Sequence, residues 1–292
     1  KKVTEYQIKY GSGVSVSNGL QTNTTLLDDD FAKHLAEYQF LVGVSVDGPA
    51  HVHDHYRKGG DGKGTHAAVM TGLESLKKHN VDYNILTLVN HNNVGMPKEI
   101  YRYLCDMGVN FHQYIECVEF DEGGDLMPFA ITGQEWGDFL CGIYDEWKKG
   151  DTRTVSVRLF DTIISMMVDG VANTCVATRD CRSYLVVEWN GDIYPCDFFV
   201  RPELKLGNVM QNSWEEMLNS ELYETFGARK SKWNAECDTC QYLSYCSGCC
   251  PKNRSPRGSD PTQLSALCSG WKQFYHHSLK GFRELANDIV AE

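Results

Sequence analysis

The chain has 292 residues, of which 42% are hydrophobic and 23% are charged, and its formal net charge is −11. This length and composition give a globular protein of one or two domains with a hydrophobic core. The acidic balance excludes a nucleic-acid binder whose affinity depends on a broad basic face. The sequence has no run of roughly 18 apolar residues and no apolar leader, so we predict a cytoplasmic protein without a membrane partner.

Apolar runs alternate with helical segments through the first half of the sequence. We predict strands over 14–22, 41–46, 83–89 and 111–118, and helices over 28–36, 65–79 and 97–107. Residues 41–46, LVGVSV, are almost wholly apolar, which is typical of a parallel strand buried on both faces. Strands that alternate with helices indicate a parallel sheet, in which ligands bind at the carboxyl ends of the strands.

The second half of the sequence has shorter elements and more turn residues. A helix is predicted over 134–149, and Asn190-Gly191 predicts a hairpin turn between strands 184–188 and 193–199. A capping box, Ser213-Trp-Glu-Glu216, predicts a helix that runs to about residue 226, and a last helix is predicted over 264–290. The change to shorter elements and more frequent turn residues predicts two domains, residues 1–154 and residues 155–292.

Eight cysteines of the second half have spacings typical of metal ligands. They are Cys175, Cys181, Cys196, Cys237, Cys240, Cys246, Cys250 and Cys268. Clustered cysteines in a reducing compartment more often bind metal than form disulfides. Four thiolates complete one iron–sulfur cluster or one tetrahedral zinc site, so eight complete two. The spacing alone leaves zinc and iron–sulfur open.

The other four cysteines are assigned less directly. Cys249 is adjacent to Cys250, and the spacing does not say which of the two is the ligand. Cys105, Cys117 and Cys141 lie in periodic segments, so we interpret them as small buried hydrophobic residues.

The cysteine pattern of residues 175–268 resembles the SPASM domain of radical S-adenosylmethionine (SAM) enzymes. Segments along nearly the whole chain resemble the anaerobic sulfatase-maturating enzymes of that group: LQTN at 20–23, LVGVSVDGP at 41–49, VRLFD at 157–161, YPCDF at 194–198 and LGN at 206–208. The resemblance implies an α/β fold. It would consist of a partial radical SAM (βα) barrel that lacks its first strands, followed by a cysteine-rich α+β SPASM domain.

The resemblance also implies how the eight cysteines are shared between two auxiliary [4Fe–4S] clusters. The first cluster would be held by Cys175, Cys181, Cys196 and Cys250. The second would be held by Cys237, Cys240, Cys246 and Cys268. Asp197, directly after a ligand cysteine, would be the catalytic base.

Four positions of the first half match residues that contact S-adenosylmethionine in the family, namely Asn23, Ser45, Arg57 and Val118. Arg57 suits the carboxylate of the cofactor, because a guanidinium forms bidentate charge-assisted hydrogen bonds. Ser45 supplies a hydroxyl group at a strand end. Val118 would pack on the adenine ring.

The chain departs from the family in the segment that cleaves S-adenosylmethionine. The CxxxCxxC ligands of the third [4Fe–4S] cluster are absent, and so is the Gly-Gly-Glu segment that grips the amino group of the cofactor. Thr24 stands where the family usually has glycine. We therefore expect an N-terminally truncated member that is inactive on its own.

For the complete enzyme, the resemblance implies oxidation of a Cys or Ser in a sulfatase polypeptide to Cα-formylglycine under anaerobic conditions. A 5′-deoxyadenosyl radical would remove a Cβ hydrogen, Asp197 would take the proton, and the auxiliary clusters would accept the surplus electron. An electron donor such as flavodoxin or ferredoxin would be the second partner. Two other hypotheses remain: a SPASM maturase of another ribosomal peptide, and a zinc-stabilised peptide-binding module.

Overall fold

The computed structural model describes residues 1–292. Contacts within the chain divide it into two compact units. The first unit contains residues 1–117 and 142–158, and the second contains residues 118–141 and 159–292. None of the helices combines the length and the apolar character that a membrane span requires.

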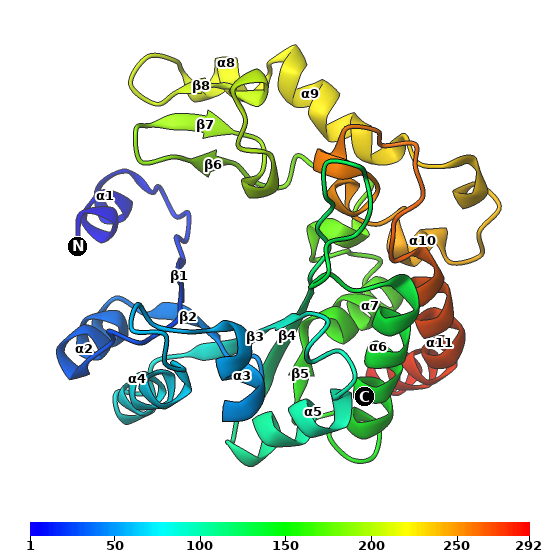
Figure 1. Cartoon of the computed structure of the whole chain (residues 1–292). Helices are drawn as coiled ribbons and strands as arrows, with labels where there is room; N and C mark the ends of the chain where they lie inside the picture. The colour runs from blue at the N-terminus through cyan, green and yellow to red at the C-terminus, as the bar shows by residue number, and fades with distance from the viewer. The chain divides into compact units, whose positions relative to one another are not determined.

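A five-stranded parallel sheet forms the centre of the first unit. Its strands are β1 (Asn18–Thr22), β2 (Phe40–Ser45), β3 (Tyr83–Val89), β4 (Phe111–Glu116) and β5 (Ser156–Val157). They follow one another across the sheet in chain order, and every neighbouring pair is parallel (Figure 1). The predicted parallel α/β fold with a partial barrel is confirmed. The run predicted as a buried parallel strand at 41–46 lies largely in β2, where Val42 and Val44 are fully buried but Leu41 is exposed.

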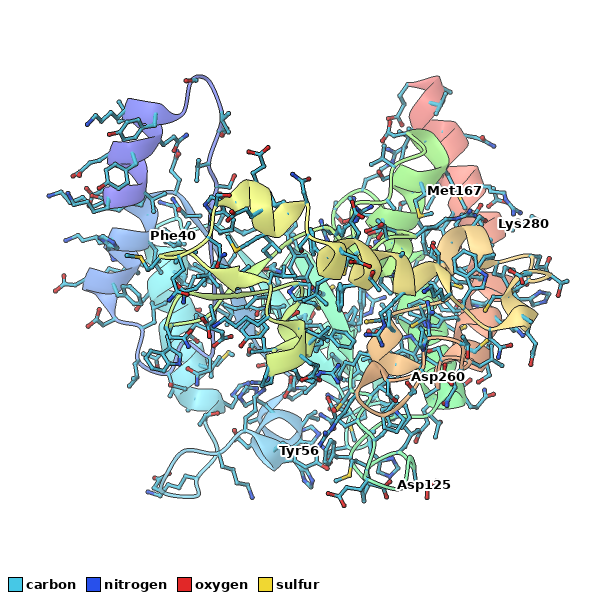
Figure 2. The ribbon with its side chains drawn as sticks, turned by 90° about the horizontal axis from the view of Figure 1, so that it is seen from above. Phe40, Tyr56, Asp125, Met167, Asp260 and Lys280 are labelled. Carbon is cyan, nitrogen blue, oxygen red and sulfur yellow. The ribbon has the colours of Figure 1, made fainter.

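Five helices accompany the sheet in the first unit: α1 (Lys2–Tyr10), α2 (Asp29–Glu37), α3 (Ala50–Tyr56), α4 (His66–Lys78) and α5 (Pro97–Asp106). Figure 1 shows α2 and α4 side by side next to the sheet. The Asp28 side chain caps α2 by accepting a hydrogen bond from the backbone N–H of Phe31. Figure 2 labels Phe40 at the start of β2 and Tyr56 at the end of α3.

The second unit contains a small antiparallel sheet of β6 (Val186–Val187), β7 (Asp192–Tyr194) and β8 (Gly207–Asn208). Its helices are α7 (Arg158–Val168), α8 (Trp214–Leu218), α9 (Glu221–Ala228), α10 (Leu243–Cys246) and α11 (Cys268–Ala291), and α6 (Gly133–Trp147) contributes its first part. The predicted hairpin is confirmed, since Gly191 takes the positive φ of +84° that its turn requires.

Several predicted boundaries are wrong. Residues 14–17 precede β1, because the pairing with β2 begins at Asn18. The helix predicted over 213–226 is two helices, since Ser220 caps α9 and accepts a hydrogen bond from the backbone N–H of Tyr223. The last helix begins at Cys268 rather than at residue 264. Helices α1, α3, α7 and α10 were not predicted.

Close glycine contacts join α11 to the first part of α6 within the second unit. A Cβ atom added to Gly270 would lie 2.0 Å from the backbone oxygen of Gly133. Next to this contact, the rings of Trp136 and Trp271 pack edge to face at 5.8 Å. The start of α11, which carries Cys268, is therefore fixed by backbone packing as well as by side chains.

Candidate functional site

Four cysteines from three segments line one pocket in the second unit. They are Cys237, Cys240, Cys246 and Cys268, and Cys249 also reaches the pocket. Trp271 and Tyr275 are among the side chains that line this pocket. The structure thus brings together the set that the resemblance implies for the second cluster.

Local backbone turns place these thiols. The backbone N–H of Cys240 donates to the carbonyl of Cys237 at 3.1 Å, which closes a tight turn between the two cysteines. After Cys246, Ser247, Gly248 and Cys249 all have positive φ, which reverses the chain within three residues. The backbone N–H of Gly248 donates to the Cys246 sulfur, and burial raises the pKa of Cys246 to about 12. A bound metal would supply the positive charge that favours the thiolate form.

The first set of cysteines lies around a second small core. Cys181 and Cys196 pack against an apolar cluster of Phe199, Leu204 and Phe226. Cys250 is within electrostatic range of Cys181, which in turn interacts with Cys175. Backbone N–H groups two residues further on, at Phe198 and Lys252, donate to the sulfurs of Cys196 and Cys250. Both sets therefore have sulfurs that accept backbone hydrogen bonds, an arrangement that suits thiolates.

The spacing of these side chains bears on the kind of metal centre. Among residues 1–292, no three His, Cys, Asp or Glu side chains come close enough together to hold a single metal ion. A structural zinc ion requires four ligands, with Zn–S distances of about 2.3 Å. In a [4Fe–4S] cluster each thiolate binds its own iron, so the four sulfurs stand farther apart. Each set of four cysteines provides the four thiolates that such a cluster requires.

Asp197 lies at the edge of the first cysteine set. Its Oδ1 accepts a hydrogen bond from the Tyr184 hydroxyl at 3.2 Å and from the Cys196 thiol at 3.3 Å. The Tyr184 hydroxyl is also 3.5 Å from the Cys196 sulfur. The Asp197 carboxylate is exposed, and its Oδ2 has no hydrogen-bond partner within the chain. One oxygen is therefore fixed and the other is open to solvent. Sequence reasoning missed Tyr184, because no spacing rule connects it to Asp197.

In the first unit, three of the predicted cofactor contacts gather at the carboxyl edge of the sheet. Asn23 follows β1, and Ser45 ends the neighbouring parallel strand β2. Arg57 ends α3 and reaches Asp47, which follows β2, through Nε–Oδ2 and Nη2–Oδ1 contacts of 2.6 and 3.1 Å. Asp47 is buried and also accepts the backbone N–H of Leu88.

The fourth predicted contact, Val118, belongs to the second unit. It is fully buried, and its carbonyl accepts a hydrogen bond from Lys252 Nζ at 2.7 Å. The same ammonium group contacts the Glu119 carboxylate at 2.6 Å. Lys252 therefore connects the segment that follows β4 to the segment that carries Cys250. Sequence reasoning did not identify this lysine.

A buried histidine supports the Asp47 loop. The Nδ1 atom of His53 is 3.3 Å from the backbone nitrogen of Asp47, and its Nε2 is 3.2 Å from the Thr65 hydroxyl. The side chain is fully buried, and burial lowers the pKa of His53 from 6.5 to about 4. Sequence reasoning did not identify this residue either.

The His53 environment predicts acid sensitivity. Since the unfolded state takes up a proton near pH 6.5 and the folded state only near pH 4, stability falls as the pH decreases through this window. The loss from His53 reaches about 3 kcal/mol at its lower end. We expect the unfolding free energy of His53→Gln, measured by denaturant titration, to depend less on pH than that of the wild type. The exposed His55→Gln is the control, and equal slopes for His53→Gln and wild type would refute this account.

Comparisons with known proteins agree with this geometry. Residues 175–241 match the SPASM family, an iron–sulfur cluster-binding domain. The chain is 37% identical to the serine-type anaerobic sulfatase-maturating enzyme of Bacteroides thetaiotaomicron, over 95% of this chain and 71% of that protein. It is 31% identical to the cysteine-type enzyme of Clostridium perfringens, over 99% of this chain and 79% of that protein.

A solved structure extends the comparison to the fold. The structure described as native anSMEcpe with bound AdoMet and Cp18Cys peptide superposes with a TM-score of 0.92 at 30% identity, over 99% of this chain and 81% of that one. A parallel α/β sheet with a SPASM iron–sulfur domain defines a radical SAM protein. Within that class, this chain belongs to the anaerobic sulfatase-maturating enzymes. The predicted family is confirmed.

Proposed function

We propose that this protein oxidises a cysteine or serine of a sulfatase polypeptide to Cα-formylglycine. The observation that carries the proposal is the Asp197 carboxylate, held on one oxygen by Tyr184 and open on the other, next to Cys196. A carboxylate with one free oxygen is suited to accept a proton from a substrate thiol or hydroxyl. Two relatives of this chain are named a serine-type and a cysteine-type anaerobic sulfatase-maturating enzyme, which supports this substrate class.

The cysteines are proposed to hold two auxiliary [4Fe–4S] clusters. The ligands of the first are Cys175, Cys181, Cys196 and Cys250, and those of the second are Cys237, Cys240, Cys246 and Cys268. The shared pocket of the second set and the backbone N–H groups that donate to Cys196, Cys246 and Cys250 support this assignment. Hydrogen bonds to the sulfurs and the solvent exposure of a cluster set its potential, so the same backbone contacts bear on electron transfer.

S-adenosylmethionine is proposed to bind at the carboxyl edge of the parallel sheet. Asn23 and Ser45 offer an amide and a hydroxyl group there, and Val118 is proposed as the apolar contact for the adenine ring. Arg57 donates one N–H of Nε and one of Nη2 to Asp47, so the N–H groups of Nη1 and the second N–H of Nη2 are left for the carboxylate of the cofactor. Asp47 thereby orients Arg57.

The residues of this chain have defined tasks in the reaction. When bound, S-adenosylmethionine and the clusters supply hydrogen abstraction and one-electron acceptance. Asp197 Oδ2 accepts the thiol or hydroxyl proton of the substrate. Tyr184 donates to Oδ1 and so fixes the rotation of the carboxylate, while Oδ2 stays available for the substrate proton. Because these 292 residues contain no CxxxCxxC motif, we propose that they do not cleave S-adenosylmethionine on their own. An electron donor such as flavodoxin or ferredoxin is the proposed second partner.

The proposed function is tested by supplying the full-length enzyme with S-adenosylmethionine, a reductant and a sulfatase-derived peptide. Peptides with cysteine and with serine at the target position are compared by mass spectrometry. We expect an aldehyde at that residue: the serine peptide loses two hydrogen atoms, and the cysteine peptide exchanges its sulfur for oxygen after loss of two hydrogens. A peptide with alanine at that position is the control. Cofactor cleavage without a mass change in either peptide would contradict the proposed substrate class.

A further inference from the structure

Two basic side chains are buried among the cysteines of the second unit. Lys230 is 1% exposed and Arg254 is 2% exposed. Lys230 Nζ donates to the carbonyl oxygens of Cys175 and Val176 at 2.6 and 2.8 Å. Both acceptors are uncharged, and Lys230 forms no ion pair with a carboxylate.

Arg254 is surrounded by carbonyl oxygens. Its Nε, Nη1 and Nη2 atoms donate to the carbonyls of Gly248, Pro261, Lys230, Cys249 and, at a longer distance, Ser247. Asp260 is close in sequence and is labelled in Figure 2, but its carboxylate accepts hydrogen bonds from Thr262 instead. Arg254 therefore also has no anionic partner.

A buried cation without a counter-charge is strongly destabilised, so buried charges in proteins are normally paired or bind ions. The groups that can supply negative charge here are sulfurs. Lys230 interacts electrostatically with Cys181 and Cys250, which both belong to the first set. Arg254 interacts most strongly with Cys249, then with Cys237 of the second set, and also with Cys250 and Cys181 of the first set. The two cations are hydrogen-bonded to each other through the Lys230 carbonyl.

We propose that Lys230 and Arg254 form a buried cation pair that neutralises the two auxiliary clusters and raises their reduction potentials. This inference depends on the proposed clusters. A cubane cluster with four thiolates is a net anion, and each electron that enters it from the oxidised substrate adds negative charge. A nearby fixed cation favours the reduced form, because Coulomb energies are large at low dielectric constant. Lys230 acts on the first cluster and Arg254 acts on both.

The test compares the wild type, Lys230→Gln and Arg254→Gln after anaerobic reconstitution with iron and sulfide. The glutamine amide can still donate to backbone carbonyls, so these variants remove charge with the least change in packing. The exposed Lys232→Gln, two residues from Lys230, is the matched control. Iron content and reduction potentials, obtained by titration monitored with electron paramagnetic resonance, are measured for each.

We expect Lys230→Gln to lower the potential of one cluster by about 59 mV or more, which is a tenfold change in a one-electron equilibrium. Arg254→Gln should lower both potentials, and Lys232→Gln should lower neither. If the glutamine variants lose iron, Lys230→Arg and Arg254→Lys should retain it. Unchanged potentials in iron-loaded glutamine variants, or equal iron loss in the neutral and charge-preserving variants, would overturn the inference. A wild-type protein without iron would instead refute the clusters themselves.

Discussion

Replacing Asp197 by asparagine is expected to lower the turnover of the full-length enzyme by roughly 10²–10⁴-fold, the range that a positioned general base contributes. The amide keeps the size of the carboxylate, but it cannot accept the substrate proton. Its contact with Tyr184 can persist through the amide oxygen, so the fold and the iron content should stay those of the wild type. The measurement is formylglycine formation under single-turnover conditions.

Two further variants sharpen the Asp197 test. Asp125→Asn changes an exposed carboxylate on a loop of the same unit, labelled in Figure 2, and should leave turnover unchanged. Tyr184→Phe removes the hydroxyl that fixes Oδ1 and should lower kcat without raising KM, because it acts on the orientation of the base. Wild-type turnover in Asp197→Asn would exclude Asp197 as the base.

The second large effect concerns which of the eight cysteines bind the same cluster. Removing one thiolate from a four-cysteine cluster is expected to abolish that cluster, so Cys250→Ala should bind half the iron of the wild type. Cys196→Ala should do the same. If Cys196 and Cys250 hold one cluster, the double variant should retain as much iron as either single variant.

The double variant distinguishes the proposed sharing from its alternative. If Cys196 and Cys250 belonged to different clusters, combining the two substitutions would remove nearly all the iron. Cys249→Ala is the control for its neighbour, because Cys249 is buried, lines the pocket and is not a proposed ligand. Full iron content in Cys250→Ala, together with a loss of iron in Cys249→Ala, would show that Cys249 is the ligand and Cys250 is not.

Much of the fold could be predicted because local patterns and the final structure agree. The apolar run at 41–46 indicates a strand, and Asn190-Gly191 indicates a hairpin turn, and each pattern extends over only a few residues. Helix α1 has no buried residues, and a helix without a buried face leaves no apolar periodicity in the sequence. The break at Ser220 was missed because the capping residue lies inside a continuous helical pattern.

Only those residues of the candidate site could be predicted whose spacing along the sequence indicates their chemistry. The cysteines are recognisable as metal ligands from their intervals, but the partners of Asp197, Arg57 and Val118 are not. Tyr184 is 13 residues from Asp197, and Lys252 is 134 residues from the Val118 carbonyl. Nothing local shows that Lys230 is buried, since lysine is almost always exposed. Contacts of this kind depend on the tertiary fold.

Eight cysteines of this chain are proposed to hold two iron–sulfur clusters. The decisive measurement is the content of iron, acid-labile sulfide and zinc in the 292-residue protein after anaerobic reconstitution. We expect about eight iron and eight sulfide atoms per chain, the content of two cubane clusters, in a brown protein. A colourless protein that contains zinc and no sulfide would contradict this proposal.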